Sequence, residues 1–445
     1  MKLIVLAVVL MWCQFSQGQT ADSTVVTALR QAGVTFSYDN SVVPMNTARE
    51  KYHDMFAAIR QAKSSVHLEY FNFRNDSIAN ALFDLLVEKA EQGVEVRAMY
   101  DSFGNSSNNR PLKSEHIKYL RQHGVEIYEV DPIKFPWFNH MLSRDHRKIV
   151  VIDGQIAYIG GMNVADYYIH GKPEIGAWHD MHCRLDGSAV NELQTIFLRM
   201  WNKTARQNVG GAKYYRSAGA SIQGGCKAVI NDTATGSVKT ICKEDKTVVF
   251  EGLKSDTTVT AYHKMVGIIN REPHVTNRIM RQFYIAAIDG ARDSIKIINP
   301  YFTLVHSVKR ALRRALHRGV KVEVLISEKC DIPVQPDVSF RNFHSLMKHG
   351  ANAYIYKGGF HHTKVIMVDG RVCTIGSCNL DARSLSWDYE CNAVIIDRYT
   401  TAELCRLFEE EKHQSFRLTP EVWKTWPGRK SKFIGWFFQI INRFL

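Results

Sequence analysis

The sequence predicts an α/β protein of two similar halves that form a pseudo-twofold pair around one shared site. Two observations lead to this fold class. A pattern of eighteen residues occurs twice, first from His146 and again from His362, with every offset kept. The segments before each copy also repeat one order of strand, helix, strand, helix, strand and hairpin, which is an α/β unit. Two such units suggest that one copy of the pattern from each half meets the other in a common cleft.

The repeated pattern places a lysine two residues, an aspartate seven residues and an asparagine seventeen residues after each histidine. The residues at these positions are His146, Lys148, Asp153 and Asn163 in the first half, and His362, Lys364, Asp369 and Asn379 in the second. A single His-x-Lys would arise by chance in a chain with 18 histidines and 57 lysines and arginines, but a repeated set of fixed offsets would not.

The elements before each copy follow from their hydrophobic periodicity. Each half begins with an apolar strand pattern, continues with a helical pattern and a second strand after a glycine, and then shows a helix-plus-strand unit. These segments are 62–71, 78–92, 93–101 and 120–128 in the first half, and 291–298, 308–318, 319–326 and 346–356 in the second.

Each copy of the pattern is predicted to be a β-hairpin. An apolar, β-branched run (148–152 and 364–368) ends at an Asp-Gly pair, and a second apolar run returns (156–159 and 372–375). Side chains two residues apart in a strand share a face, so each histidine lies beside its lysine. An imidazole next to an ammonium at a strand end suits a phosphate, and the asparagine amide adds a neutral donor.

The motif aspartates have a different role. Seven residues of strand at about 3.3 Å each separate Asp153 and Asp369 from their own histidines, so we interpret both as turn and packing residues, although we retain them in the active-site motif. Better orienting carboxylates are Asp180 and Glu390, which follow the two hairpins at similar distances. A carboxylate on one ring nitrogen fixes the histidine tautomer and leaves the other nitrogen to react.

The doubled His-x-Lys-x4-Asp pattern with its downstream Gly-Gly/Ser-x-Asn resembles the phospholipase D superfamily. The chain resembles bacterial cardiolipin synthases over about residues 64–397. The short segments that carry this resemblance are His-Arg-Lys at 146–148, Gly-Gly-Met-Asn-Val-Ala-Asp at 160–166, Asn-Pro-Tyr-Phe at 299–302, and Gly-Ser-Cys-Asn-Leu-Asp-Ala-Arg-Ser at 376–384. The resemblance implies two phospholipase D-like domains with the active site between them. It further implies a phosphohistidine route in which phosphatidylglycerol is both donor and acceptor and glycerol is released.

Within that reaction we assign His146 as the nucleophile and His362 as the acid/base, while pseudo-symmetry leaves the reverse assignment open. The lysines and Asn163/Asn379 would stabilise charge on the phosphate, so no metal or other cofactor is expected. No cysteine spacing resembles a zinc site. His179, His361 and His140 are interpreted as solvated or packing residues.

Two other function classes stay open. A hydrolase of the same fold, either a phospholipase D or a nuclease, would use water in place of the second alcohol. A non-catalytic protein that binds membranes or nucleic acid is disfavoured by the two intact motifs. The net charge of +13 favours an anionic partner, and we expect the membrane surface and its anionic phospholipid rather than nucleic acid.

The domain boundaries follow from the repeats. We expect a signal peptide at 1–18, the first phospholipase D-like domain at 19–201, a linker or insert at 202–277, the second domain at 278–425 and a basic-aromatic tail at 426–445. Residues 1–18 combine a basic start, an apolar core too short for a comfortable membrane span and a small-x-small cleavage site. We therefore expect an exported protein, peripheral on the outer (periplasmic) face of the cell membrane, and no lipid on Cys13.

The tail carries Phe433, Trp436, Phe437, Ile440, Ile441 and Phe444 on one helical face after a basic stretch. Such a stripe suits core packing equally well, but its terminal position and basic flank favour an interfacial membrane helix. Of the eight cysteines left after the signal, Cys226 and Cys242 are the best disulfide candidates. The small core positions are Cys183, Cys373, Cys378 and Cys391.

Overall fold

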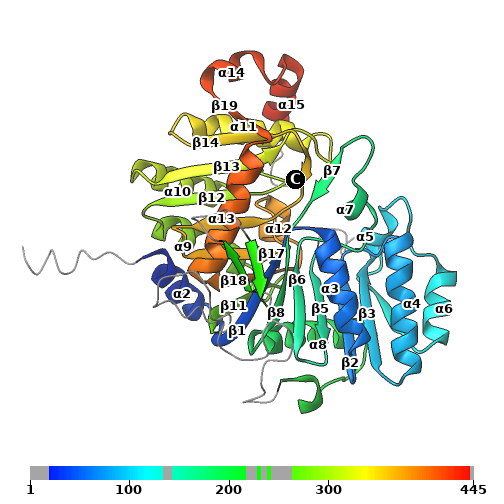
Figure 1. Cartoon of the computed structure of the whole chain (residues 1–445). Helices are drawn as coiled ribbons and strands as arrows, with labels where there is room; N and C mark the ends of the chain where they lie inside the picture. The colour runs from blue at the N-terminus through cyan, green and yellow to red at the C-terminus, as the bar shows by residue number, and fades with distance from the viewer. Residues whose placement is uncertain (1–19, 134–142, 217–227, 232–237, 242–262, 441–445) are drawn as a thin grey trace, which may run out of the picture.

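The computed structural model describes residues 20–133, 143–216, 228–231, 238–241 and 263–440. One 15-stranded sheet runs through the molecule (Figure 1), in the order β19-β14-β13-β12-β16-β17-β18-β11-β1-β8-β6-β5-β2-β3-β4. Read outward from its centre, where β11 meets β1, the sheet has the same succession of seven strands on both sides, and β19 adds one more strand beyond β14. The predicted α/β fold of two similar halves is therefore confirmed.

The first half of the sheet and its helices come from the N-terminal part of the chain. In chain order they are β1 (Phe36–Met45), α3 (Ala48–Arg60), β2 (Ser65–Tyr70), α4 (Ser77–Glu91), β3 (Glu95–Asp101), α5 (Ser102–Ser106), α6 (Ser114–Gln122), β4 (Glu126–Val130), β5 (Lys148–Ile152), β6 (Ile156–Gly160), α7 (Tyr167–His170), β7 (Ala177–His179), β8 (His182–Asp186) and α8 (Ala189–Ala205).

The second half repeats this order with two main differences: its short strand β15 precedes the hairpin, whereas β7 follows the hairpin of the first half, and β19 has no counterpart. Its elements are β11 (Lys264–Arg271), α9 (Ile279–Gly290), β12 (Ser294–Ile298), α10 (His306–His317), β13 (Lys321–Ser327), α11 (Gln335–Met347), β14 (Asn352–Tyr356), β15 (Gly359–His361), β16 (Val365–Val368), β17 (Val372–Gly376), α12 (Ala382–Ser386), β18 (Glu390–Ile396), α13 (Arg398–Lys412) and β19 (Ser415–Leu418). Outside the repeat lie α2 (Ala21–Gln31), a 3-10 turn (Ala212–Tyr214), β9 (Ala228–Asn231), β10 (Val238–Ile241), α14 (Pro420–Thr425) and α15 (Arg429–Ile440).

The predicted linker at 202–277 differs from the structure at its C-terminal end. Strand β11 lies within this range, yet it pairs antiparallel with β1 on one side and with β18 on the other. It is the counterpart of β1, so the second half begins before residue 278. The sequence comparison of the halves missed this strand because it started from the later strand β12 and its equivalent β2.

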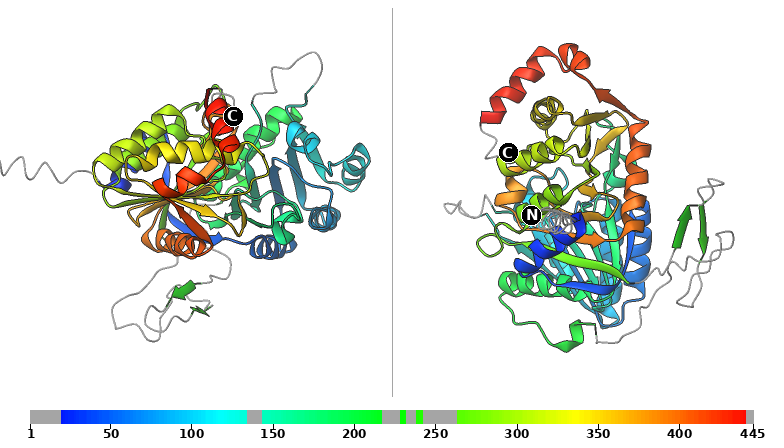
Figure 2. Two further views of the ribbon diagram at one scale, coloured as in Figure 1. Left: turned by 90° about the horizontal axis from the view of Figure 1, so that it is seen from above. Right: turned by 90° about the vertical axis from the view of Figure 1, so that its left-hand side faces the viewer.

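Helices cover both faces of the sheet (Figure 2), which explains why its central strands are apolar throughout. In β5, Val150 and Ile152 pack with α3, α4 and α6, whereas Ile149 and Val151 face the core that includes α8. All four side chains are at most 2% exposed. Burying each one contributes about 1.5–3 kcal/mol. This double burial holds the hairpin β5–β6 rigidly in the middle of its half.

Both predicted hairpins are present. Strand β5 pairs with β6, and β16 pairs with β17, each antiparallel across its Asp-Gly turn. Asp153 and Gly154 have φ of 53° and 63°, and Asp369 and Gly370 have φ of 52° and 60°. These left-handed values define the type I′ turn whose twist matches that of the strands.

The tail folds as helix α15 and packs on α11. The Ser431 hydroxyl donates to the Asp337 carboxylate, and a Cβ on Gly435 would lie 2.3 Å from the Asp337 carbonyl oxygen. The opposite face leaves Phe433, Trp436 and Phe437 exposed by 63%, 49% and 48%. In the described parts of the chain, every helix is too short or too polar to cross a membrane.

Several predictions concern residues outside those that the structure describes: the signal peptide, Cys13, His140, the Cys226–Cys242 pair and the last tail positions, Ile441 and Phe444. The four cysteines predicted as core residues are buried and free.

Candidate active site

Both motif histidines line one cavity of about 380 Å³. Its walls come from both halves of the chain and include the two motif asparagines, six aromatic residues and several charged groups: Asn163, Asn379, Phe71, Phe103, Tyr167, Tyr168, Trp178, Tyr301, Arg144, Asp331, Asp381, Arg383 and Asp388 among others. The shared cleft that the doubled motif predicts is therefore where the two histidines meet.

The first histidine is held by the second half of the chain. His146 lies just before β5, and its backbone N–H donates to the carbonyl oxygen of Tyr389 at 3.0 Å. Its ring Nδ1 lies 3.0 Å from the carboxylate of the next residue, Glu390, which starts β18 and is fully buried. With Nδ1–H donating to the carboxylate, Nε2 carries the free lone pair.

The second histidine is held by the first half in the same way. The backbone N–H of His362 donates to the carbonyl oxygen of His179 at 2.7 Å, and its Nδ1 lies 2.7 Å from the carboxylate of the next residue, Asp180. Asp180 and Glu390 thus contact the histidines as orienting carboxylates would, but each contacts the histidine of the other half.

The glycines of the motif make room for these carboxylates. A Cβ on Gly161 would lie 2.3 Å from Asp180 Oδ1, which is too close for any side chain. The equivalent position in the second half is Ser377, whose hydroxyl donates to Glu390. The difference between Gly-Gly and Gly-Ser in the two copies therefore corresponds to a hydrogen bond that only the second copy makes to its neighbouring carboxylate.

The motif lysines do not line the cavity. Lys148 and Lys364 are buried, and each ammonium donates to the carbonyl oxygen of the histidine two residues before it. Each lysine lies beside its histidine, as the sequence predicts. Because its ammonium is turned to a backbone carbonyl and does not line the cavity, this geometry does not provide a direct contact between the lysine and a bound phosphate. Each ammonium instead fixes the backbone of its histidine and adds positive charge beneath the cavity.

Burial and these ammonium groups together set the charges of the site. Burial, helped by the Lys148 ammonium and opposed by Glu390, lowers the pKa of His146 to about 4. Burial and then Lys364 also lower the pKa of His362 against the pull of Asp180. Both imidazoles are therefore mainly neutral near pH 7 in the free enzyme, so either can act as nucleophile or base.

The carboxylates stay ionised. Burial alone would raise the pKa of Glu390, but the neighbouring His146 and Lys148 outweigh it, and the pKa is lowered. The pKa of Asp180 is lowered in the same way, by Lys364 and His362 against burial. Lys148 loses some of its own basicity, because burial, with Lys364 adding repulsion, lowers its pKa to about 7.

The motif asparagines face the cavity as predicted. Asn163 and Asn379 are 5% and 4% exposed, and among the described residues the Oδ1 atom of each has no hydrogen-bond partner. Pocket-facing amides of this kind can serve the polar groups of a bound phosphodiester. The segments that follow β6 and β17 carry them to the cavity wall.

The motif aspartates lie at the far end of each hairpin. The Asp153 carboxylate accepts hydrogen bonds from the backbone N–H groups of Lys63, Ser64 and Ser65 and from the Ser64 hydroxyl, at 2.7–2.9 Å. The Asp369 carboxylate accepts three backbone N–H bonds, from residues 292–294, each at 2.9 Å. Neither carboxylate reaches a histidine, so both are turn and packing residues, as interpreted from the sequence.

Arg144 is a site residue that the sequence did not reveal. Its guanidinium pairs with Asp101 at 2.9 Å, its backbone N–H donates to Asp388, and the side chain lines the cavity while only 1% exposed. Its partners stand 43 and 244 residues away along the chain. The one local signal is its place two residues before His146.

Comparison with known proteins agrees with this geometry. The family model described as "Cardiolipin synthase, PLD-like domain" matches residues 55–201 and 284–412. The probable cardiolipin synthase YwiE of Bacillus subtilis (strain 168) is 31% identical over 88% of this chain and 70% of its own length. The major cardiolipin synthase ClsA of the same organism is 31% identical over 87% of this chain and 72% of its own.

Among solved structures, the phosphatidylserine synthase of Haemophilus influenzae Rd KW20 aligns over 95% of this chain and 100% of its own, with a TM-score of 0.67 at 14% identity, which supports the fold. The family model covers more than half of the chain, in one region for each structural half. The chain therefore belongs to the cardiolipin synthase family of phospholipase D-like proteins.

Proposed function

We propose that this chain is a phosphatidyltransferase that makes cardiolipin from two molecules of phosphatidylglycerol through a phosphohistidine intermediate, with release of glycerol. The observation that carries the proposal is the pair of imidazoles in one cavity, each with a buried carboxylate on Nδ1, which leaves Nε2 for the reaction. Two such groups supply a nucleophile and an acid/base for two successive displacements at phosphorus.

In the first step, His146 Nε2 attacks the phosphorus of one phosphatidylglycerol, and the bond from phosphorus to the glycerol headgroup oxygen breaks. The negative charge of the bound phosphodiester favours protonation of His362, which then gives its proton to the departing glycerol oxygen. In the second step, neutral His362 takes the proton of a hydroxyl on a second phosphatidylglycerol. That oxygen attacks phosphorus, the bond to His146 breaks, and cardiolipin forms.

The assignment of the nucleophile rests on exposure. The side chain of His146 is 15% exposed and that of His362 is 7% exposed, so His146 is the more accessible of the two imidazoles. The two candidates can be distinguished by trapping the intermediate on labelled phosphatidylglycerol. The label should stay on a peptide that contains His146 in the His362→Asn variant, whereas label on His362 in the His146→Asn variant would reverse the roles.

The cavity wall favours an alcohol over water as the acceptor. Phe71 packs edge-on to His146 at 5.2 Å, and Trp178 and Tyr301 lie 5.8 Å and 6.1 Å from the His362 ring. Aromatic walls of this kind exclude water and contact the apolar part of a lipid better than a hydrated group. A water-filled site of the same residues would instead hydrolyse the intermediate.

The test of the reaction is incubation of the purified chain with phosphatidylglycerol vesicles and analysis of the lipids by mass spectrometry. We expect cardiolipin and free glycerol in equal amounts. Phosphatidic acid as the main product would replace the transferase with a hydrolase of the same fold. The His146→Ala/His362→Ala double variant is the blank that reports contaminating activity.

We further propose that helix α15 docks the protein on the membrane that holds its substrate. Its exposed Phe433, Trp436 and Phe437 lie on the face turned away from α11, whose first residue, Gln335, lines the cavity. Aromatic side chains favour the headgroup boundary, and each nearby lysine or arginine adds about 1 kcal/mol of attraction to anionic lipid. The basic residues at 429–432 are in place for this attraction.

Vesicle sedimentation tests this docking. The triple variant Phe433→Ser/Trp436→Ser/Phe437→Ser should bind phosphatidylglycerol vesicles more weakly than the parent chain yet still turn over a short-chain soluble substrate. The matched control, Tyr38→Ser/Tyr399→Ser, removes aromatic rings that are 54% and 58% exposed on β1 and α13. If both variants sediment with vesicles as the parent does, the α15 face has no membrane role.

Export to the outer face of the cell membrane is also a proposal, and it rests on the sequence of residues 1–18. N-terminal sequencing of the protein recovered from its native envelope fraction tests it. A mature chain that starts at Gln19 supports cleavage after a small-x-small site. A chain that still begins at Met1 in the cytoplasmic fraction would refute export.

A further inference from the structure

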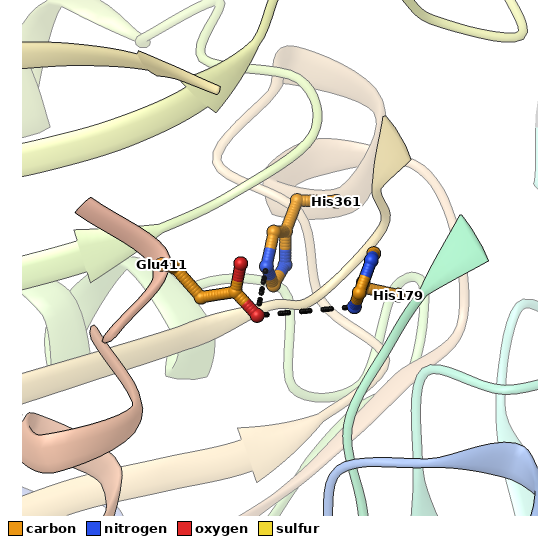
Figure 3. A group of neighbouring side chains, drawn as sticks. All are labelled: His179, His361 and Glu411. Carbon is orange, nitrogen blue, oxygen red and sulfur yellow. Dashed lines mark ion pairs between the residues drawn. The ribbon is translucent and has the colours of Figure 1, made fainter. Parts of the chain in front are cut away.

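A second cluster of ligand-type side chains lies on the seam between the two halves, outside the cavity. His179 ends β7 in the first half, His361 ends β15 in the second, and Glu411 stands near the end of α13. The parallel pairing of β7 with β15 puts the two histidines directly opposite each other in register. Figure 3 shows one carboxylate oxygen of Glu411 facing both imidazoles.

The distances within this cluster fit a bound cation. Glu411 Oε1 lies 3.3 Å from His361 Nε2 and 3.8 Å from His179 Nδ1, and the candidate ligand atoms all lie within 4.8 Å of one another. Two ligands bonded to Zn²⁺ at about 2.0–2.1 Å lie about 3.3 Å apart in a tetrahedral site. The Glu411–His361 pair is therefore at the separation that a tetrahedral ion requires, whereas the other pairs, at no more than 4.8 Å, are wider than that separation.

The outer nitrogens of both histidines are held by hydroxyl groups. His361 Nδ1 lies 3.2 Å from the Thr363 hydroxyl, and His179 Nε2 lies 3.1 Å from the Tyr356 hydroxyl. A hydroxyl oxygen that accepts the N–H of the outer nitrogen leaves the inner nitrogen with its lone pair. Metal-bound histidines are oriented by partners of this type.

The inner atoms are poorly satisfied by the protein alone. His361 is only 5% exposed, and among the described residues its inner atom Nε2 has no hydrogen-bond partner of good geometry. The second oxygen of Glu411, Oε2, is also buried without such a partner. Buried polar atoms are normally bonded, so the unpaired His361 Nε2 points to a ligand at this position. Access from solvent is open, because the His179 and Glu411 side chains are 31% and 20% exposed.

We propose that His179, His361 and Glu411 form a binding site for one divalent transition-metal ion, of which Zn²⁺ matches the two nitrogen donors and one oxygen donor best. A water molecule from the open side completes four-coordination. The ion joins the first half to the second through β7, β15 and α13. It stands one residue before Asp180 on one strand and one residue before His362 on the other, so it fastens the seam beside the cavity.

The test is metal binding by the full chain, independent of any lipid reaction. The metal-free protein is titrated with Zn²⁺ against a chromophoric chelator, and with Co²⁺ while visible absorption is recorded. We expect one Zn²⁺ per chain, the intense visible bands of tetrahedral Co²⁺ and a higher Tm when Zn²⁺ is present. Protein without bound metal, or Co²⁺ spectra of the hydrated ion only, would overturn the proposal.

Variants locate the ion. His179→Gln and Glu411→Gln change partly exposed residues and should each weaken Zn²⁺ binding at least about 100-fold, beyond the loss that an outer-shell partner causes. Their Tm without metal should equal that of the parent, which guards against misfolding. The matched control is His123→Gln, which removes an exposed histidine 3.2 Å from Glu91. Equal affinity in all three variants would refute the assignment.

Discussion

Asp153→Asn separates two possible roles of the motif aspartate, in catalysis and in the stability of the fold. Asn tolerates the left-handed backbone of Asp153, so the turn itself is kept and the substitution acts on the carboxylate alone. Oδ1 accepts three of the four hydrogen bonds, from Ser64 N–H, Ser64 hydroxyl and Ser65 N–H, and Oδ2 accepts the bond from Lys63 N–H. An amide keeps the first three without their charge and faces the fourth donor with an NH₂ group.

The size of the effect follows from these bonds. A hydrogen bond to a charged group contributes about 1.5–3 kcal/mol and a neutral one about 1 kcal/mol. Weakening three of these hydrogen bonds and losing the fourth would therefore cost several kcal/mol in total. Water reaches this half-exposed turn and relieves part of the loss. We expect Asp153→Asn to lower the free energy of unfolding by about 2–3 kcal/mol. Asp369→Asn should follow with a slightly smaller loss, because Asp369 accepts three bonds.

The assay pairs urea unfolding with the initial rate of cardiolipin formation, both at one pH. The rate per folded molecule should stay within about threefold of the parent, since neither aspartate touches a histidine. Asp289→Asn is the control for loss of a surface charge: its partner Arg314 is 45% exposed, and the cost should stay below about 1 kcal/mol. A rate loss of about 100-fold or more in Asp153→Asn, with an unchanged unfolding midpoint, would refute the structural role.

The other predictions concern the site itself. His146→Ala and His362→Ala should each lower the rate by about 10³-fold or more with an unchanged circular dichroism spectrum, because each histidine serves a separate transfer; near-normal activity in either would exclude the shared cavity. Asp180→Asn and Glu390→Gln should lower the rate by about 10²–10⁴-fold and leave stability less affected, as a kcat series with urea melts would measure. In the pH profile of kcat/KM, which reports the free enzyme, the acid limb should lie near the pKa of His146, about 4, with the rate falling as pH falls and His146 gains its proton. Glu390 raises that pKa, so Glu390→Gln should move the limb to lower pH, and a shift upward would contradict the pairing.

Local patterns made much of this structure predictable. The Asp-Gly turn, the apolar strands around it and the repeat of both all depend on residues within a few positions of one another. The role of Asp153 was predictable for the same reason, since strand geometry alone places it far from His146. The wide separation of the two residues within one hairpin needed no knowledge of tertiary structure.

Contacts between the halves were not predictable in this way. Order along the chain associates Asp180 with the first motif and Glu390 with the second, and only the three-dimensional pairing exchanges them. The lysine contacts were unpredictable for a similar reason. Strand alternation places Lys148 beside His146, but β5 begins only at Lys148, and the irregular backbone before it lets the Lys148 ammonium donate to the His146 carbonyl oxygen. The His179, His361 and Glu411 cluster has no sequence spacing at all, because it comes from three distant segments.

The exchange of carboxylates explains why the chain carries both halves. His146 takes its backbone and ring partners from Tyr389 and Glu390, and His362 takes the corresponding pair from His179 and Asp180. The two hairpins also share one buried apolar cluster across the seam. A half on its own would therefore expose apolar side chains of its hairpin, and its histidine would lose both the bond that fixes its backbone and the carboxylate that fixes its tautomer. The halves thus depend on each other for their core as well as for the competence of each motif. Anything that tightens the seam at β7–β15, including an ion on His179 and His361, acts on the residues next to Asp180 and His362 without touching the hairpins.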